Sequence, residues 1–371
     1  MWQRFDIAEI RDDMARIRGL GCDIVRFFLM WEAFAPQRDH LDERALRNFD
    51  AMMSAIADAK LLAMPTLFCG HMSGVNWIPA WALDRATPHG RFRTIAAGEF
   101  SPYGIGDFYC NDDLVAAQVL MARAVGERAL GNPALYAWDL GNEFSNMREP
   151  REPIDAASWS ALLTEELLEA SGAGTTAGIH GEDLERDRHI RPSMIAEPLQ
   201  IATMHGYSVY SVFSRGRLDT QVVPFLCALV QSFARKPVLF SEFGNPQCPP
   251  GASEVGGIAC LSEAEMAQYA DAVLARLLLQ GAVGAMWWCW ADYDPSLATL
   301  PPFDRAPHEL HFGIVRADGS EKSVAQVLSR FSRAAHAVTE SPPPLVTEDA
   351  YYAALPQGVF DLYRDYCRAH D

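Results

Sequence analysis

The sequence is short of positive charge. Its 31 Lys and Arg residues face 48 Asp and Glu residues, which gives a formal net charge of −17. Nucleic acids and anionic membranes are bound through basic surface, so we expect neither as a partner. No apolar run approaches the length of a bilayer span, and the first residues lead into an amphipathic helix pattern instead of a secretory signal. The sequence therefore predicts a cytoplasmic protein, with secretion as the alternative if the start is truncated.

Several catalytic and cofactor motifs are also absent. The His residues nowhere take the His-Glu-x-x-His spacing of metal hydrolases, and no Gly-rich loop precedes a helix as in nucleotide-binding proteins. The Gly-x-Ser-x-Gly motif of esterases is missing as well. We expect neither a metal nor another cofactor.

The eight Cys residues show no Cys-x-x-Cys spacing. Cys248 and Cys260 bracket a loop rich in Pro and Gly, and they either form a disulfide or remain thiols. Reduced thiols are the expectation, because disulfides are rare in a cytoplasm.

Apolar residues make up 49% of the chain, and apolar strand-like runs alternate with helical patterns along it. Such alternation predicts parallel βα units, and their number favours an α/β fold of the (β/α)8 TIM-barrel type over a doubly wound sheet. The predicted strands cover 23–29, 62–68, 135–140, 175–180, 200–205, 237–242 and 284–290. The predicted helices cover 7–20, 42–60, 112–129, 156–171, 218–234, 262–280 and 321–337.

The predicted barrel is one strand short. The chain opens on what would be the helix after strand one, and the residues before it are too few and too polar to form that strand. The first strand is therefore expected to be missing from this chain, through a truncated start or through another segment that fills its place. We predict a TIM-barrel catalytic domain over residues 1–340, followed by a Pro-rich linker and tail over 341–371 that packs on the barrel.

The stretch 69–111 is longer than ordinary connections, and long loops are usually functional or disordered. Its aromatic content favours a folded loop that lines a cleft. Its aromatic residues include Trp77, Trp81, Phe92, Tyr103 and Tyr109.

Two apolar strands each end in a glutamate. Residues 135–143 read Leu-Tyr-Ala-Trp-Asp-Leu-Gly-Asn-Glu, and residues 237–244 read Pro-Val-Leu-Phe-Ser-Glu-Phe-Gly. A buried carboxylate is costly to desolvate, and burial raises the pKa of a carboxyl group toward the range of a proton donor. One such Glu alone fits a structural ion pair. Glycoside hydrolysis needs a pair of carboxyl groups, and two Glu residues at the same edge of a parallel sheet meet this requirement.

Chemistry in an α/β barrel lies where the strands end. The residues at the predicted strand ends are Arg26, His71, Asn142, Glu143, His205, Tyr207, Glu242 and Trp288. The Asn-Glu pair, the distal Glu, the His-x-Tyr at 205–207 and the Trp-rich run at 287–290 together resemble the retaining glycoside hydrolases of clan A. Glycoside hydrolase family 5, which includes cellulases and mannanases, is the closest match, over about residues 5–337.

The resemblance implies that Glu143 is the general acid/base and Glu242 the nucleophile that forms a glycosyl-enzyme intermediate. One carboxyl must therefore be protonated while the other is ionised. Arg26 is expected to hold Glu242 ionised through a charge-assisted hydrogen bond, and an interior ion pair is the alternative for this arginine.

Three further residues receive roles at the reacting sugar. Asn142 is expected to hydrogen-bond the 2-hydroxyl, with a turn residue as the alternative. Tyr207 is expected to donate to Glu242, and His205 to orient a sugar or a carboxylate.

Aromatic residues are the candidates for stacking on sugar rings. Trp288 is expected to form the platform under the reacting sugar, although its neighbour Trp287 makes the assignment uncertain by one residue. Trp31 and Trp77 are further subsite candidates, with plain packing as the alternative, and His71 is a further substrate-binding candidate.

The sequence thus predicts a retaining β-glycosidase without a cofactor, whose substrate is an oligosaccharide with a β-mannosidic or β-glucosidic link. A β-galactosidase-like or aryl-β-glycosidase activity on the same pair is the second enzymatic interpretation. A non-catalytic carbohydrate-binding barrel is the alternative from another class.

Overall fold

The computed structural model describes residues 2–334 and 345–370, so the predicted Pro-rich linker at 341–344 lies outside the described residues. The chain divides into two compact units. Unit 1 consists of Met1–Ile179 and Arg188–Ile201, and unit 2 consists of His180–Asp187 and Ala202–Asp371.

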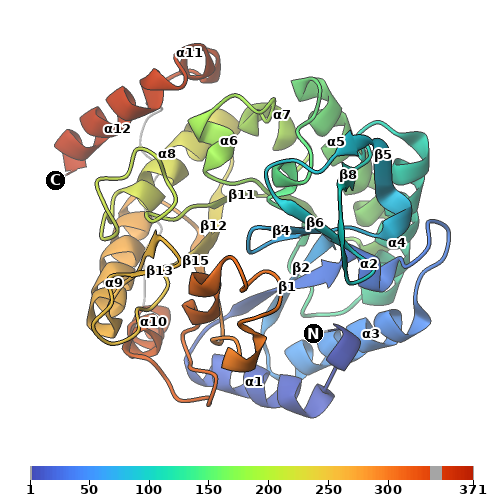
Figure 1. Ribbon diagram of the computed structural model, residues 1–371, viewed down its shortest axis with the longest axis horizontal. Helices are drawn as coiled ribbons and strands as arrows, with labels where there is room; N and C mark the ends of the chain where they lie inside the picture. Colours follow the sequence, from blue (N-terminus) through green and yellow to red (C-terminus); the bar gives the residue numbers. More distant parts are fainter. Residues whose placement is uncertain (1, 335–344, 371) are drawn as a thin grey trace. The chain divides into compact units, whose positions relative to one another are not determined.

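Unit 1 is built on a four-stranded parallel sheet in the order β1-β2-β9-β10 (Figure 1). The strands are β1 (Ile24–Met30), β2 (Leu62–Cys69), β9 (Trp138–Asn142) and β10 (Thr175–Gly178). β9 and β10 are buried along their whole length, and β2 is buried after its first residue. This burial is typical of a parallel sheet that is covered on both faces.

The long helices of unit 1 begin at side chains that cap them. They are α1 (Ile7–Gly19), α3 (Glu43–Asp58), α4 (Asp112–Ala129) and α5 (Pro153–Ser171), whereas α2 (Trp31–Phe34) and α7 (Pro192–Ile195) are single turns. Asp6, Asp42 and Asn111 each accept a hydrogen bond from a backbone N–H in the first turn of the helix that follows. The predicted ends of these three helices are confirmed to within two residues, whereas α5 starts earlier than predicted because Pro153 opens its first turn.

The long connection at 69–111 is an ordered part of unit 1. It forms one small sheet in the order β3-β4-β6-β7 and a second sheet that pairs β5 with β8. The strands are β3 (His71–Met72), β4 (Val75–Trp77), β5 (Leu83–Pro88), β6 (Arg93–Ala96), β7 (Glu99–Ser101) and β8 (Tyr103–Ile105). The sequence predicted a folded loop here but not these strands, because each is too short to show a periodic pattern.

Unit 2 repeats the same architecture with a three-stranded parallel sheet in the order β11-β12-β15 (Figure 1). The strands are β11 (Ala202–His205), β12 (Val238–Phe243) and β15 (Gly284–Trp287), and the helices include α8 (Val222–Ala234), α9 (Glu263–Leu279) and α10 (Ser323–Arg333). The last strand is three residues shorter than predicted. After Trp287 the chain leaves the sheet, although the Trp288 N–H still donates to Phe243 O at 2.8 Å.

The tail packs on α8. Nearly every residue of α8 is buried, on all sides of the helix, so an additional element must cover the face that points away from the sheet. That element is the helix pair α11 (Glu348–Ala353) and α12 (Gln357–His370), which Figure 1 shows in red. The ring of Phe225 lies 5.0 Å from Tyr363 and 5.3 Å from Tyr366. The hydroxyl of Tyr363 donates to Asp219 at 2.7 Å.

Residues 2–6 add no strand to unit 1. Trp2–Arg4 form a short 3-10 helix, and Trp2 Nε1 donates to Phe28 O at 2.6 Å. In the parts of the chain that the structure describes, no helix is both long enough and apolar enough to cross a membrane.

Candidate active site

Glu143 follows a sharp exit from β9. Its N–H donates to Gly178 O at the end of β10 at 2.9 Å, and the next three residues form the one-turn helix η3 (Phe144–Asn146). The backbone is left-handed at Gly141 (φ 80°) and at Glu143 (φ 45°). This conformation is rare for residues other than Gly and occurs mostly where the surroundings hold it, often at functional sites.

Two side chains of unit 1 face the Glu143 carboxyl. Asn146 Nδ2 donates to Glu143 Oε2 at 3.2 Å, and His71 Nε2 lies 3.7 Å from the same oxygen. The Glu143 side chain is 17% exposed, so it is not sealed in the core. The carboxyl is thus held by an amide donor and still accessible to a ligand.

The tautomer of His71 follows from its neighbours. Asn76 Nδ2 donates to the backbone oxygen of Asn146 at 3.1 Å, which fixes Asn76 Oδ1 as the atom 2.7 Å from His71 Nδ1. Because Oδ1 only accepts, Nδ1 carries a proton. His71 therefore turns a lone pair toward Glu143 when it is neutral and a proton when it is charged.

Arg26 and Asp139 form an ion pair inside unit 1. Arg26 Nε donates to Asp139 Oδ2 at 2.8 Å, and Thr66 donates to the same oxygen at 2.7 Å. The side chains of Arg26 and Asp139 are 6% and 1% exposed. Arg26 thus forms the interior ion pair that was the alternative for this residue. The contact between Arg26 and Glu242 stays a prediction.

Asn142 is oriented by the same arginine. Arg26 Nη2 donates to Asn142 Oδ1 at 2.7 Å, and Asn142 Nδ2 donates to His71 O at 2.9 Å. Since Arg is a donor only, these contacts fix which end of the amide is oxygen. Asp139 was not among the predicted site residues, because its only signal was a lone acidic residue inside an apolar strand.

The two tryptophans proposed as subsites of unit 1 differ. Trp31 is 0% exposed and packs against the rings of Phe68, Trp81 and Phe108, so it offers no face to a ligand. The structure therefore assigns Trp31 to packing, the alternative, because bulky rings surround it. Trp77 lies in β4 and is partly exposed, and its subsite role stays a prediction.

In unit 2, Glu242 lies within β12 and meets two side chains of the neighbouring strand end. The hydroxyl of Tyr207 donates to Glu242 Oε1, and His205 Nδ1 lies 3.5 Å from Oε2. His205 and Glu242 are register partners in β11 and β12. The expected contact between Tyr207 and Glu242 is thus present.

A polar cluster that the sequence did not reveal lies behind Tyr207. The ring of Tyr210 lies 5.3 Å from that of Tyr207, and its hydroxyl donates to Glu309 Oε1 at 2.9 Å. His308 Nε2 is 2.8 Å from the same hydroxyl. His308 and Glu309 belong to the 3-10 helix η5 (Pro307–His311), which lies in a segment without a periodic pattern.

The Trp-rich run places its members differently. Trp287 Nε1 donates to Phe312 O at 3.0 Å, and its ring packs on Phe243 at 5.2 Å. Trp287 is thereby held by unit 2 itself. Trp288 follows the strand and is partly exposed, so it remains the candidate for the sugar platform.

The loop after β12 carries a disulfide. Cys248 and Cys260 are bonded, with Cα atoms 5.1 Å apart, so the expectation of reduced thiols is wrong for this structure. The hairpin of β13 (Glu254–Val255) and β14 (Ile258–Ala259) returns the chain and brings the two residues together. This separation of Cα atoms lies within the usual range of disulfides.

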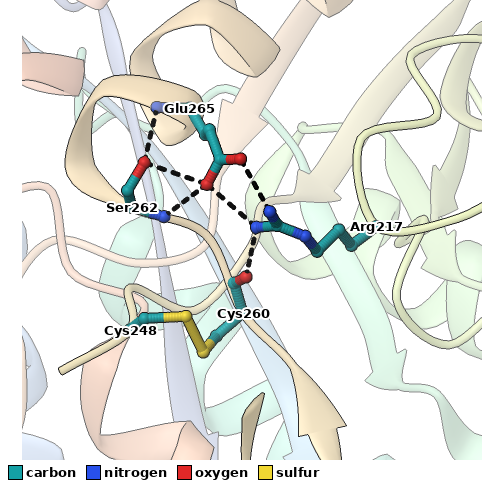
Figure 2. Close-up of a disulfide and its surroundings, with 5 residues drawn as sticks. All are labelled: Arg217, Cys248, Cys260, Ser262 and Glu265. Atoms are coloured by element: carbon teal, nitrogen blue, oxygen red, sulfur yellow. Dashed lines mark hydrogen bonds and ion pairs between the residues drawn. A yellow bond between two sulfur atoms is a disulfide. The ribbon is translucent and has the colours of Figure 1, made fainter. Parts of the chain in front are cut away.

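Figure 2 shows what surrounds the disulfide. Arg217 Nη1 donates to Cys260 O at 2.7 Å, and Arg217 Nη2 pairs with Glu265 at 2.7 Å. Hydrogen bonds from the Arg217 side chain and from the Ser262 backbone lower the pKa of Glu265 to about 2. Glu265 in turn completes the capping box of α9 with Ser262.

Comparison with known proteins rests on structure. No protein-family model matches the chain, and no curated protein matches its sequence. Among solved structures, an exo-β-1,4-mannosidase from Opitutaceae bacterium strain TAV5 is 24% identical with a TM-score of 0.72, covering 90% of this chain and 56% of that one. A GH5_18 protein from Streptomyces cattleya in complex with GlcNAc is 20% identical with a TM-score of 0.77, covering 99% of this chain and 86% of that one.

A GH5_18 protein from Bifidobacterium longum subsp. infantis is also 20% identical, with a TM-score of 0.74, and covers 92% of this chain and 76% of that one. The chain has a glycoside hydrolase family 5-like fold. It spans a little over half the length of the exo-mannosidase. In this family 5-like fold, Glu143 and Glu242 occupy the strand ends described above.

Proposed function

We propose that this chain is a retaining β-glycosidase that hydrolyses β-mannosides, with Glu143 as the general acid/base and Glu242 as the nucleophile. The observation that carries the proposal is that each carboxylate stands at the end of a buried parallel strand, where side chains suited to its role contact it. Tyr207 donates to Glu242, whereas Glu143 is 17% exposed beside Asn146 and His71.

In the first step, ionised Glu242 attacks the anomeric carbon while protonated Glu143 gives its proton to the leaving oxygen. The bond between carbon and the leaving oxygen breaks, and a bond between carbon and a Glu242 oxygen forms. In the second step, Glu143 takes a proton from water, the water oxygen attacks the same carbon, and Glu242 is released. Asn142, oriented by Arg26, is placed to hydrogen-bond the 2-hydroxyl.

The preference for a β-mannoside rests on the fold likeness. One similar structure is named an exo-β-1,4-mannosidase, and GH5_18 structures were solved in complex with Manβ1-4GlcNAc. A short oligosaccharide with a non-reducing β-mannosyl unit is therefore the first substrate to test. We also infer that both parallel sheets belong to one (β/α)8-type barrel. The likeness over 99% of the chain supports this inference.

The test is hydrolysis of a panel of nitrophenyl β-glycosides by the wild type, by Glu242→Ala and by the matched control Glu265→Gln. The nitrophenyl β-mannoside is expected to be cleaved best. The wild type and the control should cleave it alike, whereas Glu242→Ala should lose about 10⁴-fold or more in kcat.

Other outcomes of the panel separate the alternatives. Preferred cleavage of the β-galactoside or of all aryl β-glycosides alike favours the second enzymatic interpretation. Sugar binding without turnover favours a carbohydrate-binding barrel. If Glu242→Ala keeps the wild-type turnover, Glu242 is not the nucleophile.

A further inference from the structure

A hydrogen-bond relay in unit 1 leads from a buried arginine to the Glu143 carboxyl. Arg188 returns to unit 1 after the segment His180–Asp187, and its side chain is 3% exposed. Its Nη1 donates to Asn146 Oδ1 at 2.9 Å, and its Nη2 donates to Ser145 O at 2.6 Å. Arg188 therefore donates to a side chain and to a backbone oxygen of η3, the turn that follows Glu143.

The hydrogen bond from Arg188 fixes the orientation of the Asn146 amide. Arg188 has donors only, so the atom of Asn146 that faces it must be the oxygen. The amide nitrogen is then the atom that faces Glu143 Oε2, and it donates at 3.2 Å. The backbone oxygen of Asn146 accepts in addition from Asn76 at 3.1 Å, which anchors the residue on a second side.

The hydrogen bond also distinguishes the two carboxyl oxygens. A protonated carboxyl carries its proton on one oxygen and accepts on the other. Oε2 accepts from Asn146, and the lone-pair nitrogen of neutral His71 lies 3.7 Å from Oε2, beyond hydrogen-bond distance, so the proton belongs on Oε1. A carboxyl without this partner presents its proton on either oxygen and in more than one rotamer.

We propose that Asn146, oriented by Arg188, is a positioning residue that aims the acidic proton of Glu143 from Oε1 at the leaving oxygen of the glycoside. This proposal rests on the proposed function. Asn146 touches no reacting atom and acts through Glu143. Its three-residue spacing from Glu143 places both within η3 and its cap.

The test compares two aryl β-mannosides that differ only in the leaving group. Dinitrophenolate departs without a proton, whereas phenolate needs one, so only the phenyl substrate depends on an aimed acid. For Asn146→Ala, kcat/KM for the phenyl mannoside should fall about tenfold to a hundredfold, because general acid catalysis as a whole contributes about 10²- to 10⁴-fold. For the dinitrophenyl mannoside it should change by less than about threefold.

Two further variants keep the test independent of misfolding. Asn146→Asp has the same shape but accepts where Asn donates, and it should move the basic limb of the kcat/KM profile to higher pH, because the ionised carboxylate loses its donor. Arg188→Lys should show a weaker form of the phenyl-specific loss. Arg123→Met, which removes an exposed pair with Glu166, is the control expected to change neither substrate.

Equal losses on both substrates, or no loss on either, would overturn the positioning role while the wild type remains a β-glycosidase. A folded wild type that cleaves neither mannoside, nor any member of the nitrophenyl panel, would instead overturn the proposed function and this inference with it. Thermal unfolding of each variant verifies that it is folded before its rates are compared.

Discussion

Glu143 and Glu242 both lie at the ends of apolar parallel strands, yet different groups hold them. Glu143 sits in a left-handed turn after β9 and is held by the amide of Asn146, which belongs to the same turn. Glu242 lies inside β12 in extended conformation and is held by the hydroxyl of Tyr207, which follows the neighbouring strand β11.

The difference fits the two proposed roles. A nucleophile must be fixed in place, and a strand residue that accepts a hydrogen bond from a buried hydroxyl is held in this way. An acid/base must change its protonation twice in each cycle, so its partners must tolerate both forms. An amide donor to one oxygen does so, because that oxygen accepts whether or not the other is protonated.

The largest effect should come from deleting each carboxylate in turn and adding azide. Both Glu143→Ala and Glu242→Ala should lose about 10³-fold or more in kcat on a nitrophenyl β-mannoside. Azide should restore turnover in both variants with opposite products, because each truncation opens a different face of the sugar. Glu143→Ala should give the β-mannosyl azide and Glu242→Ala the α-mannosyl azide, as read by NMR.

The same anomer from both variants would break the comparison, since the two carboxylates would then not lie on opposite faces. Glu265→Gln serves as the control in this series and should need no azide.

The second prediction concerns the buried pair that supports the Glu143 side. Asp139→Ala leaves the Arg26 guanidinium without its carboxylate, and the loss of one partner of a buried pair typically costs about 3–5 kcal/mol. The free energy of unfolding in urea should fall by that amount. Asp113→Ala, which removes the exposed pair with Arg38, should cost less than about 1 kcal/mol. Equal costs for both variants would show that the Arg26 pair is not part of the core.

The elements of both units were predictable because their signals are local. Apolar strands and capped helices appear as periodic runs, and α4 was predicted with its observed bounds. Strand ends then pointed to both carboxylates. The tail was harder to place, although α8, apolar on every side, indicated that something must cover it.

The side chains that support the carboxylates were not predictable in the same way. Asp139 meets Arg26 across 113 residues of sequence, so the pair appears only once the register of the sheet is known. Arg188 and η5 lie in segments without periodicity, where the sequence gives no direction for a side chain. The Cys248–Cys260 bond also depended on a hairpin whose strands are two residues long.

The third prediction uses the cross-linked loop, which follows Glu242 and has no counterpart after Glu143. The double variant Cys248→Ser, Cys260→Ser should lower the free energy of unfolding by about 3 kcal/mol, the amount expected for a closed loop of this size. Ellman titration of the unfolded wild type with and without reductant should differ by two thiols. Equal titres would mean reduced cysteines in the isolated protein and would support the cytoplasmic location proposed from the sequence.

The smallest effect should come from Tyr207→Phe, which removes only the hydroxyl that donates to Glu242. A hydrogen bond to a charged group contributes about 1.5–3 kcal/mol, so kcat/KM should fall about tenfold to a hundredfold. The loss should be read from kcat/KM for the nitrophenyl β-mannoside, and thermal unfolding should verify that the variant is folded.

Tyr210→Phe is the matched control, because it removes a neighbouring hydroxyl that is bonded to Glu309 instead of Glu242. Its kcat/KM should change by less than about threefold, because Glu242 keeps its hydroxyl donor. Equal losses in both variants would contradict the comparison, since the hydroxyl bonded to Glu242 would then have no part of its own in holding that carboxylate.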